Sequence, residues 1–417
     1  MSATDTTTST DETAVPGPKR LQPPQIAIVI GIGIALLVAL SGVAAGLVFK
    51  FEDASPVKRE VFEGIPGWLR LVFYTVIPVM FIYGAVMFSY RMRNWERGNP
   101  DKRDITPKNA KKRLENLRGG LYMQTLLRDP AAGIMHSMIY FGFLILLAVT
   151  TVLEINHQLP EQAKFLHGDV YKAYAFVGDF AGLVFTAGVV WAIVRRYVQK
   201  PYRIRIKTRA EHAIILGVLL AIGVTGFLAE MFRIAQEGRP SFEKFSFIGY
   251  PLSGLVANLS TVNGWHTAMW VLHVLTFIAF LVILPTTMLR HIFTSPLNMY
   301  LSDKDRPKGA MRAMPNLMET ELESFGASVV EDFTWKQLLD TDACTMCGRC
   351  TSVCPAHATG KPLDPREIVL KAGTVMAATG TPVVSPPIGV DKEITVSADS
   401  LFERITAEEV WSCTTCK

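Results

Sequence analysis

The chain has 417 residues, of which 49% are hydrophobic and only 19% are charged, and its mean hydropathy is +0.26. Soluble domains carry about a quarter charged residues, so this composition indicates apolar segments too long for a water-soluble core. The formal net charge is only +5, and the basic residues flank apolar segments, which argues against a nucleic-acid-binding protein.

Residues 1–25 are rich in Thr, Ser, Asp and Pro and are predicted to form a disordered tail. Residues 26–299 contain six apolar runs of roughly 20 residues, which is the length that crosses a bilayer as a helix. We therefore expect an all-α integral membrane domain of six transmembrane helices. The predicted spans are Ile26–Phe49, Leu69–Tyr90, Gly133–Glu154, Tyr171–Val194, Ala213–Phe232 and Trp265–Leu289.

The distribution of Lys and Arg predicts the orientation, because these residues are retained on the cytoplasmic side of a membrane. The loop after the second span contains eleven of them, from Arg91 to Arg128, and the loop after the fourth contains seven, from Arg195 to Arg209. The three alternate loops together contain seven. We expect a multi-pass protein of the cell inner (cytoplasmic) membrane, embedded in the lipid bilayer with both termini in the cytoplasm.

The first basic loop contains leucines at helical spacing among its lysines and arginines, including Leu114, Leu117 and Leu121. This pattern predicts an amphipathic helix. Such a helix rests on anionic lipid or provides a docking surface for a partner.

Three acidic residues, Glu154, Asp179 and Glu230, lie within the apolar runs, where a charge costs about 2.5 kcal/mol or more. All three belong to the outer half of their spans in the expected topology. They are either solvated at the membrane interface or contribute to a proton path or a quinone-binding pocket.

The histidines suggest haem ligands. His136 lies at the cytoplasmic start of the third span and His157 just past its outer end, about 31 Å further along a helix. His273 and His291 lie in the sixth span, about 27 Å apart, and the two spans run in opposite directions. His136 therefore meets His291 at the inner level, and His157 approaches His273 at the outer level. Two such pairs can hold two b-type haems suited to electron transfer.

The sixth span, with His273, VLTFIAFLVILPTTMLR, His291 and IFTSPLN, resembles the haem-binding helix of the nitrate reductase gamma subunit family and of heterodisulfide reductase E-like membrane subunits. The resemblance implies that these two histidines ligate different haems. The third span, with His136 in IMHSMIYFGF, is similar to the partner helix of the family. The family has a second histidine ten residues on, where this chain has Leu146.

The outer haem therefore has more than one candidate for its second ligand. His157 is the preferred one, and the competing histidines are His167 and His266. A protein with a single haem is the remaining alternative.

All six cysteines lie after residue 343, which excludes a disulfide framework in the membrane domain. The run CTMCGRCTSVCP has the C-x2-C-x2-C-x3-C-P spacing of a ferredoxin [4Fe-4S] site. Zinc sites use separated cysteine pairs, so this spacing disfavours zinc. We expect the [4Fe-4S] ligands to be Cys344, Cys347, Cys350, Cys354, Cys413 and Cys416.

Residues 300–332 are polar and predicted to be a linker, and residues 333–417 are predicted to form a small cytoplasmic α-helical ferredoxin-like domain. A short helix is expected over Phe333–Leu339. Asp364 before Pro365 predicts the start of another helix, and Thr406 with Glu409 forms the sequence of a capping box. His357, after the first cysteine run, is expected at the surface.

The segment CTMCGRCTSVCPAHATGKPLDPREIV with the later WSCTTCK resembles the two-cluster module of heterodisulfide reductase D-like and glycerol-3-phosphate dehydrogenase C-like proteins. Joined to the haem domain, it is similar to fused membrane iron-sulfur oxidoreductases of the electron-transfer-flavoprotein:menaquinone type. In two-cluster ferredoxins the fourth cysteine of a run ligates the other cluster, and two cubanes need eight thiolates. We therefore expect the natural protein to continue past Lys417.

Together these features predict a quinone-linked oxidoreductase that passes electrons between a cytoplasmic partner and the quinone pool through [4Fe-4S] clusters and haem b. The resemblance implies electron-transfer flavoprotein as the donor and menaquinone as the acceptor. One alternative is a quinol-oxidising subunit that supplies a cytoplasmic heterodisulfide or sulfur reductase. The other is a cytochrome b anchor subunit without chemistry of its own.

Overall fold

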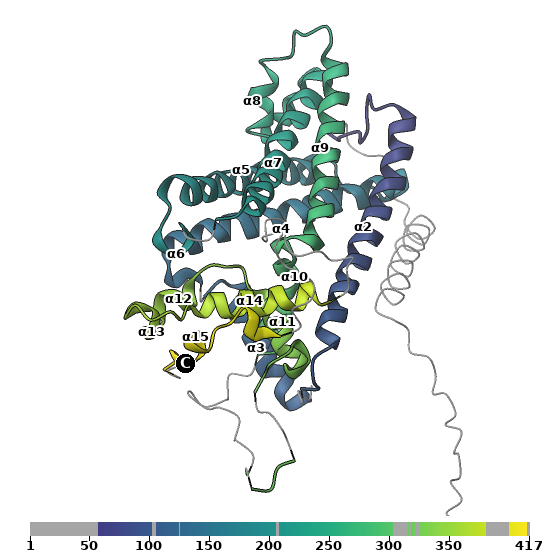
Figure 1. The fold of residues 1–417 in the computed structure, drawn as a ribbon. Coiled ribbons are helices and arrows are strands. Elements are labelled where there is room, and N and C mark those ends of the chain that lie inside the picture. The colour runs from purple at the N-terminus through teal and green to yellow at the C-terminus, as the bar shows by residue number, and fades with distance from the viewer. Residues whose placement is uncertain are drawn as a thin grey trace, which may run out of the picture.

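The computed structural model describes residues 57–101, 106–124, 126–205, 208–302, 316, 318–321, 326–380 and 400–414 (Figure 1). Within these ranges the structure is helical and contains no β-strand. Five helices are long and apolar enough to cross a membrane: α2 (Gly67–Glu96), α4 (Pro130–Gln158), α5 (Gly168–Ile193, extended to Gln199 by the π-helix η3), α7 (Ala210–Gln236) and α9 (Val262–Thr286).

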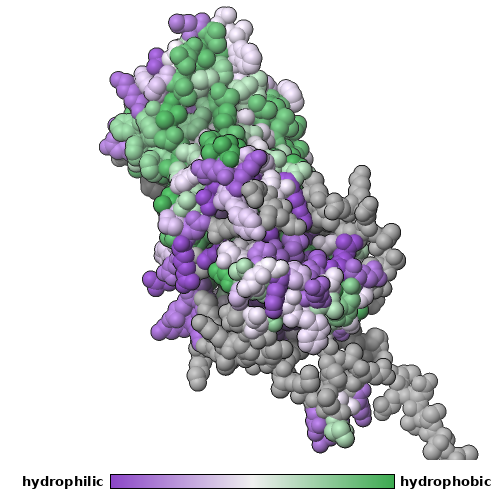
Figure 2. All heavy atoms as spheres, turned by 60° about the vertical axis from the view of Figure 1, so that its left-hand side comes forward, coloured by the Kyte–Doolittle hydropathy of each residue, from purple (hydrophilic) through white to green (hydrophobic). Residues whose placement is uncertain are grey.

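These helices confirm five of the six predicted spans, and the chain is a membrane protein. The first predicted span and the N-terminal tail lie outside the described residues. Figure 2 shows apolar residues over the upper part of the molecule and hydrophilic residues over the lower part. Large apolar side chains such as Leu71, Phe81 and Phe180 are exposed on the bundle. Lipid is the environment that makes such exposure favourable.

The long helices pack in the order α4, α5, α7, α9 and α2. Glycine allows the closest approach between α4 and α5, because a Cβ on Gly142 would lie 2.9 Å from the Cβ of Phe185. Small residues at helix interfaces are the usual means of packing in membranes. Phe185, Val189 and Phe280 then form the centre of the apolar core in this bundle.

The sixth predicted span ends earlier than expected. Helix α9 ends at Thr286, a short 3-10 helix η5 (Met288–Arg290) follows, and His291 begins the separate helix α10 (His291–Tyr300). Pro285 cannot donate the hydrogen bond of a helical residue, and Thr287 adopts an extended conformation. The prediction that His291 lies inside this span was therefore wrong, since the span breaks before it.

Six helices lie at the lower end of the molecule (Figure 1). They are α10, α11 (Trp335–Ala343), α12 (Arg349–Val353), α13 (Pro355–Ala358), α14 (Pro365–Ala378) and α15 (Ala407–Trp411). The start of α14 at the Asp364 cap and the Thr406–Glu409 capping box of α15 confirm those two predictions. Leu338, Leu339 and Met376 pack with Trp95 of α2 in one core. The lower helices are thus attached directly to a membrane helix.

The predicted amphipathic helix of the first basic loop forms α3 (Pro107–Leu121). Its Asn116 donates a hydrogen bond to the carbonyl of Ser302 (3.3 Å), so α3 packs beside α10. The remaining short helices are η1 (Leu126–Arg128), η2 (Glu161–Ala163), α6 (Tyr202–Arg205), η4 (Ser241–Phe245), α8 (Gly249–Ser253), η6 (Val330–Asp332) and η7 (Leu401–Glu403). The domain boundaries at residues 26, 300 and 333 stay predictions, since much of 1–56 and 303–325 lies outside the described residues.

Candidate haem and cluster sites

The structure brings His136 and His291 together at the end of the bundle that is predicted to be cytoplasmic. His136 lies in the second turn of α4, whose start is capped by Asp129. His291 is the first residue of α10, after the break at Thr287. Their ring centroids are 6.4 Å apart. A bond from a metal to an imidazole nitrogen is about 2 Å long, so two imidazoles on opposite sides of one metal have ring centres roughly 6 Å apart.

The hydrogen bonds of His291 also suit a metal ligand. Its Nδ1 atom lies 2.7 Å from the carbonyl oxygen of Met288 and donates to it, because a carbonyl can only accept. The Nε2 atom is then left free to bind, as is usual for metal-ligating histidines. Met288 is fixed in turn, since its backbone N–H donates to the buried carboxylate of Glu211. The pair therefore fits the inner haem that the sequence predicts.

His273 has a similar arrangement at the outer level. Its Nδ1 atom is 2.9 Å from the hydroxyl of Thr225, and that hydroxyl donates to the carbonyl of Ala221 (2.6 Å). Thr225 therefore accepts from His273, which leaves the Nε2 atom of His273 free. The ring lies beside α7, where a Cβ on Gly226 would be 3.4 Å from it.

The second ligand of an outer haem stays a prediction. The ring of His157 packs 5.2 Å from Phe62, and His157 lines a cavity of about 200 Å³ together with His167. His266 is buried. Within the part of the chain that the structure describes, no ring contact joins His273 to any of these three histidines.

Two of the three acidic residues lie together. Asp179 is buried and accepts hydrogen bonds from the backbone N–H groups of Ile248 (2.6 Å) and Gly249 (3.2 Å). Glu230 lies beside the same segment, because a Cβ on Gly249 would be 2.7 Å from its carboxyl carbon. Glu154 lies elsewhere, where it accepts from the hydroxyl of Tyr74 (3.0 Å). In the predicted topology all three carboxyl groups belong to the outer half of the bundle.

Sequence reasoning missed the buried network beside this pair. Arg233 donates to Glu237 (2.8 Å) and Glu243 (2.7 Å), and Tyr171 also donates to Glu243 (2.6 Å). Burial would raise the pKa of Glu243, but the charge and hydrogen bonds of Arg233 hold it below its usual range. The sequence signal was Arg233 itself, a basic residue at the outer end of an apolar run.

The first cysteine run follows α11. Cys344 is the C-cap of α11 and Cys354 the N-cap of α13, while Cys347 and Cys350 are exposed. Gly348, at φ 71°, has the left-handed conformation that turns the chain between them. Burial raises the pKa of the Cys344 thiol. A thiolate is therefore disfavoured there until a metal binds it.

In the described part of the chain, no three His, Cys, Asp or Glu side chains lie close enough together to bind one metal ion. Cys413 is exposed after α15, and Cys416 lies outside the described residues.

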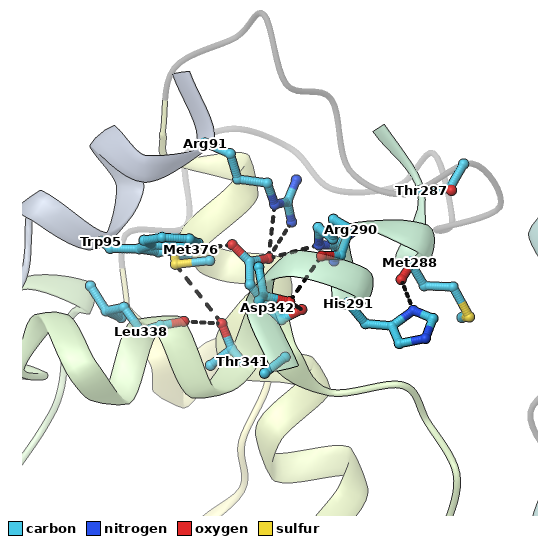
Figure 3. Close-up of polar contacts among 12 residues, drawn as sticks. Arg91, Trp95, Thr287, Met288, Arg290, His291, Leu338, Thr341, Asp342 and Met376 are labelled. Atoms are coloured by element: carbon cyan, nitrogen blue, oxygen red, sulfur yellow. Dashed lines mark hydrogen bonds and ion pairs between the residues drawn. The ribbon is translucent and has the colours of Figure 1, made fainter. Parts of the chain in front are cut away.

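A buried carboxylate joins the two candidate sites (Figure 3). Asp342, near the end of α11, accepts from Arg91 (2.6 Å), Trp95 (2.7 Å) and Arg290 (3.1 Å). Burial would raise the pKa of Asp342, but the two guanidinium groups and these hydrogen bonds hold it below its usual range. No sequence pattern indicates this contact, because Arg91 and Arg290 read as ordinary charges at the predicted cytoplasmic ends of spans.

Comparison with known proteins explains this combination of sites. Residues 130–306 match the nitrate reductase gamma subunit family, and residues 335–356 match a 4Fe-4S binding domain. Two regions of the chain therefore resemble a nitrate reductase gamma-type membrane domain and an iron-sulfur binding domain. The resemblance predicted from the histidine helix and the first cysteine run is thereby confirmed.

Three curated proteins are similar to parts of this chain. The chain is 30% identical over 317 residues to the EtfAB:quinone oxidoreductase of Syntrophomonas wolfei, covering 70% of this chain and 43% of that protein. It is 30% identical over 320 residues to the probable iron-sulfur-binding oxidoreductase FadF of Bacillus subtilis, covering 70% and 44%. A probable membrane-anchored ferredoxin of Chromohalobacter salexigens is 33% identical over 146 residues, covering 31% and 22%.

The chain spans less than half the length of each of these relatives. No solved structure matches it.

Proposed function

We propose that this chain forms the membrane electron conduit of an oxidoreductase that connects a cytoplasmic redox protein to the quinone pool. The observation that carries the proposal is the facing pair His136 and His291, which is joined through Asp342 to the first cysteine run. A haem with two imidazole ligands supplies one-electron transfer. Electrons entering at the cysteine run would then have a haem site directly beside them.

The residues of the chain take separate roles in this proposal. His136 and His291 hold the inner haem, and His273 with His157 holds the outer one. The cysteines hold [4Fe-4S] clusters at the cytoplasmic end. Asp179 and Glu230 exchange the protons that accompany quinone chemistry, because their carboxyl groups both lie beside Gly249. Glu154 is a further candidate for this proton path.

The favoured donor is electron-transfer flavoprotein and the favoured acceptor is menaquinone. Support comes from the relative named EtfAB:quinone oxidoreductase, which is similar over 70% of this chain. The basic first loop and the iron-sulfur segment lie at the same end of the molecule and provide a docking surface. Electrostatic docking predicts that added salt slows the reaction.

The test uses the purified chain in lipid nanodiscs under anaerobic conditions. Optical and EPR spectra first establish whether haem and clusters are present. Reduced electron-transfer flavoprotein is then added, and we expect the haem α-band to appear and to decay when a menaquinone analogue is supplied. A chain without haem, or haem that the flavoprotein does not reduce, would contradict the proposal. Reduction of the haem by menaquinol alone, but not by the flavoprotein, would favour the quinol-oxidising alternative.

A further inference from the structure

The carboxylate of Asp342 lies where α2, η5 and α11 meet (Figure 3). Its side chain is 1% exposed. Arg91 donates to its Oδ1 atom from both Nε (2.8 Å) and Nη2 (2.6 Å), and the Nε atom of Arg290 donates to the same oxygen (3.1 Å). The indole of Trp95 donates to Oδ2 (2.7 Å). Two segments that are far apart in sequence, α2 and η5, therefore bind one buried negative charge on α11.

This charge is adjacent to both candidate cofactor sites. Arg290 immediately precedes His291, and Asp342 lies two residues before Cys344. The backbone is fixed as well, because Thr294 donates to the carbonyl of Asp342 (3.2 Å) and Ser295 to the carbonyl of Ala343 (3.4 Å). His291, a proposed haem ligand, and Cys344, the first proposed cluster ligand, are thus sequence neighbours of the two partners of one ion pair.

Positive charge exceeds negative charge around this ion pair. Arg91, Arg209, Arg290, Asp342 and Glu211 line one cavity of about 40 Å³ beside Cys344. Among the residues that the structure describes, the Nη1 atoms of Arg91 and Arg290 are buried without a hydrogen-bond partner. Buried charges are screened much less than exposed ones, so loss of one charge here would not be offset by solvent.

We propose that Asp342 is a positioning residue that also sets the reduction potentials of the inner haem and of the adjacent cluster. The inference rests on the proposed function. Reduction adds one negative charge to a cofactor, so nearby guanidinium groups raise its potential and the Asp342 carboxylate lowers it. When bound, the haem and the cluster would supply one-electron transfer, and Asp342 with its arginines would set the charge around both.

The test compares midpoint potentials in four proteins by anaerobic titration, with optical detection of haem and EPR detection of the cluster. Asp342→Asn keeps the shape of the side chain and removes its charge, so both potentials should shift to more positive values. Asp340→Asn removes the same charge from the same helix, at a side chain that is 48% exposed, and should leave both potentials near wild type. Adding Arg91→Gln to Asp342→Asn removes the excess positive charge and should return both potentials toward wild type.

Potentials in Asp342→Asn that equal those in Asp340→Asn, or that do not return in the double variant, would overturn the inference. If Asp342→Asn loses its cofactors, the single variant Arg91→Gln tests the inference instead. It removes one positive charge and should shift both potentials to more negative values. Loss of cofactors from both single variants would show a purely structural role and also overturn it. Absence of haem and clusters from the wild-type chain would instead refute the proposed function, so the two failures are distinguishable.

Discussion

At the scale of single residues, the candidate haem ligands differ in the hydrogen bond that each imidazole Nδ1 atom makes. His291 donates from Nδ1 to a backbone carbonyl, and His273 donates to the hydroxyl of Thr225. Both leave Nε2 directed away from the hydrogen bond. The Nδ1 atom of His136 is buried without a partner among the described residues. We expect His136 to depend on its metal bond more than His291 does, because no second hydrogen bond orients its ring.

Replacing His136 or His291 with Ala should therefore remove the inner haem. If the chain binds two haems, each variant should lose about half of the reduced α-band absorbance, measured as a haem-to-protein ratio in purified protein. His357→Ala is the matched control, since His357 lies in α13 beside the cysteine run and away from the membrane helices. An unchanged ratio in both ligand variants would exclude the assignment.

The lowered pKa of Glu243 predicts that the stability of the fold depends on pH. Its pKa lies below the usual range in the folded chain, so its carboxylate stabilises the fold above the unfolded-state pKa. This contribution is lost as pH falls through the folded-state pKa. We expect the thermal midpoint of unfolding to fall on acidification below about pH 4.

The variant Glu243→Gln isolates this effect from other carboxylates. It leaves the Arg233 charge with less compensation and should lower the stability at neutral pH by about 3–5 kcal/mol. Its thermal midpoint should then change less with acid than that of the wild type. Thermal unfolding in detergent between pH 3 and 7 measures both quantities, and parallel acid curves would contradict the prediction.

At the scale of helices, local signals were reliable where a cap or a long apolar run defines the element. The Asp364 cap of α14 and the capping box of α15 are short-range patterns, and each helix begins where its pattern predicts. The end of α9 was missed because apolar residues continue through Met288 and Leu289. The break depends on Pro285 together with the contact between Met288 and Glu211 of another helix. Sequence periodicity does not contain that second contact.

The close contact between α4 and α5 predicts that adding one methyl group at Gly142 lowers the stability of the fold. A Cβ on Gly142 would approach the backbone of Phe185 to 3.0 Å, whereas a Cβ on Gly217 would meet nothing within 4 Å. Gly142→Ala should cost about 1–3 kcal/mol through overpacking, less a helix-propensity gain of up to about 1 kcal/mol. Gly217→Ala should be neutral or stabilising. Thermal unfolding of both variants tests this difference, and equal midpoints would show that α4 adjusts without cost.

At the scale of the whole molecule, five membrane helices and the cysteine run could be predicted from the sequence, because each has a composition or spacing of its own. The proximity of His136 and His291 followed from the predicted topology, and their role as haem ligands stays a prediction. The Asp342 contact could not be predicted in the same way. Arg91 and Asp342 are 251 positions apart, and neither belongs to a recognisable motif. The network around Arg233 and Glu243 was missed for the same reason, since only the folded bundle brings its members together.

Orientation in the membrane can be tested because the chain has no cysteine before residue 343. Ser241 and Thr208 are exposed, in the outer and inner loops respectively. A membrane-impermeant maleimide applied to intact spheroplasts should label Ser241→Cys. It should leave Thr208→Cys and the unaltered protein unlabelled until the membrane is opened. Labelling of Thr208→Cys but not of Ser241→Cys would contradict the predicted orientation and indicate the opposite topology.

The distance along the chain between Arg91 and Asp342 has a consequence for biosynthesis. A ribosome adds about 5–20 residues per second, so Arg91 is made roughly 10–50 s before Asp342. During this interval Arg91 and then Arg290 lack the carboxylate that binds both of them in the folded protein. The membrane helices must therefore insert with this end of the bundle still hydrated. Once α11 has been made, Asp342 binds both arginines and covers this end of the bundle. Docking of the iron-sulfur segment is therefore a late step of assembly.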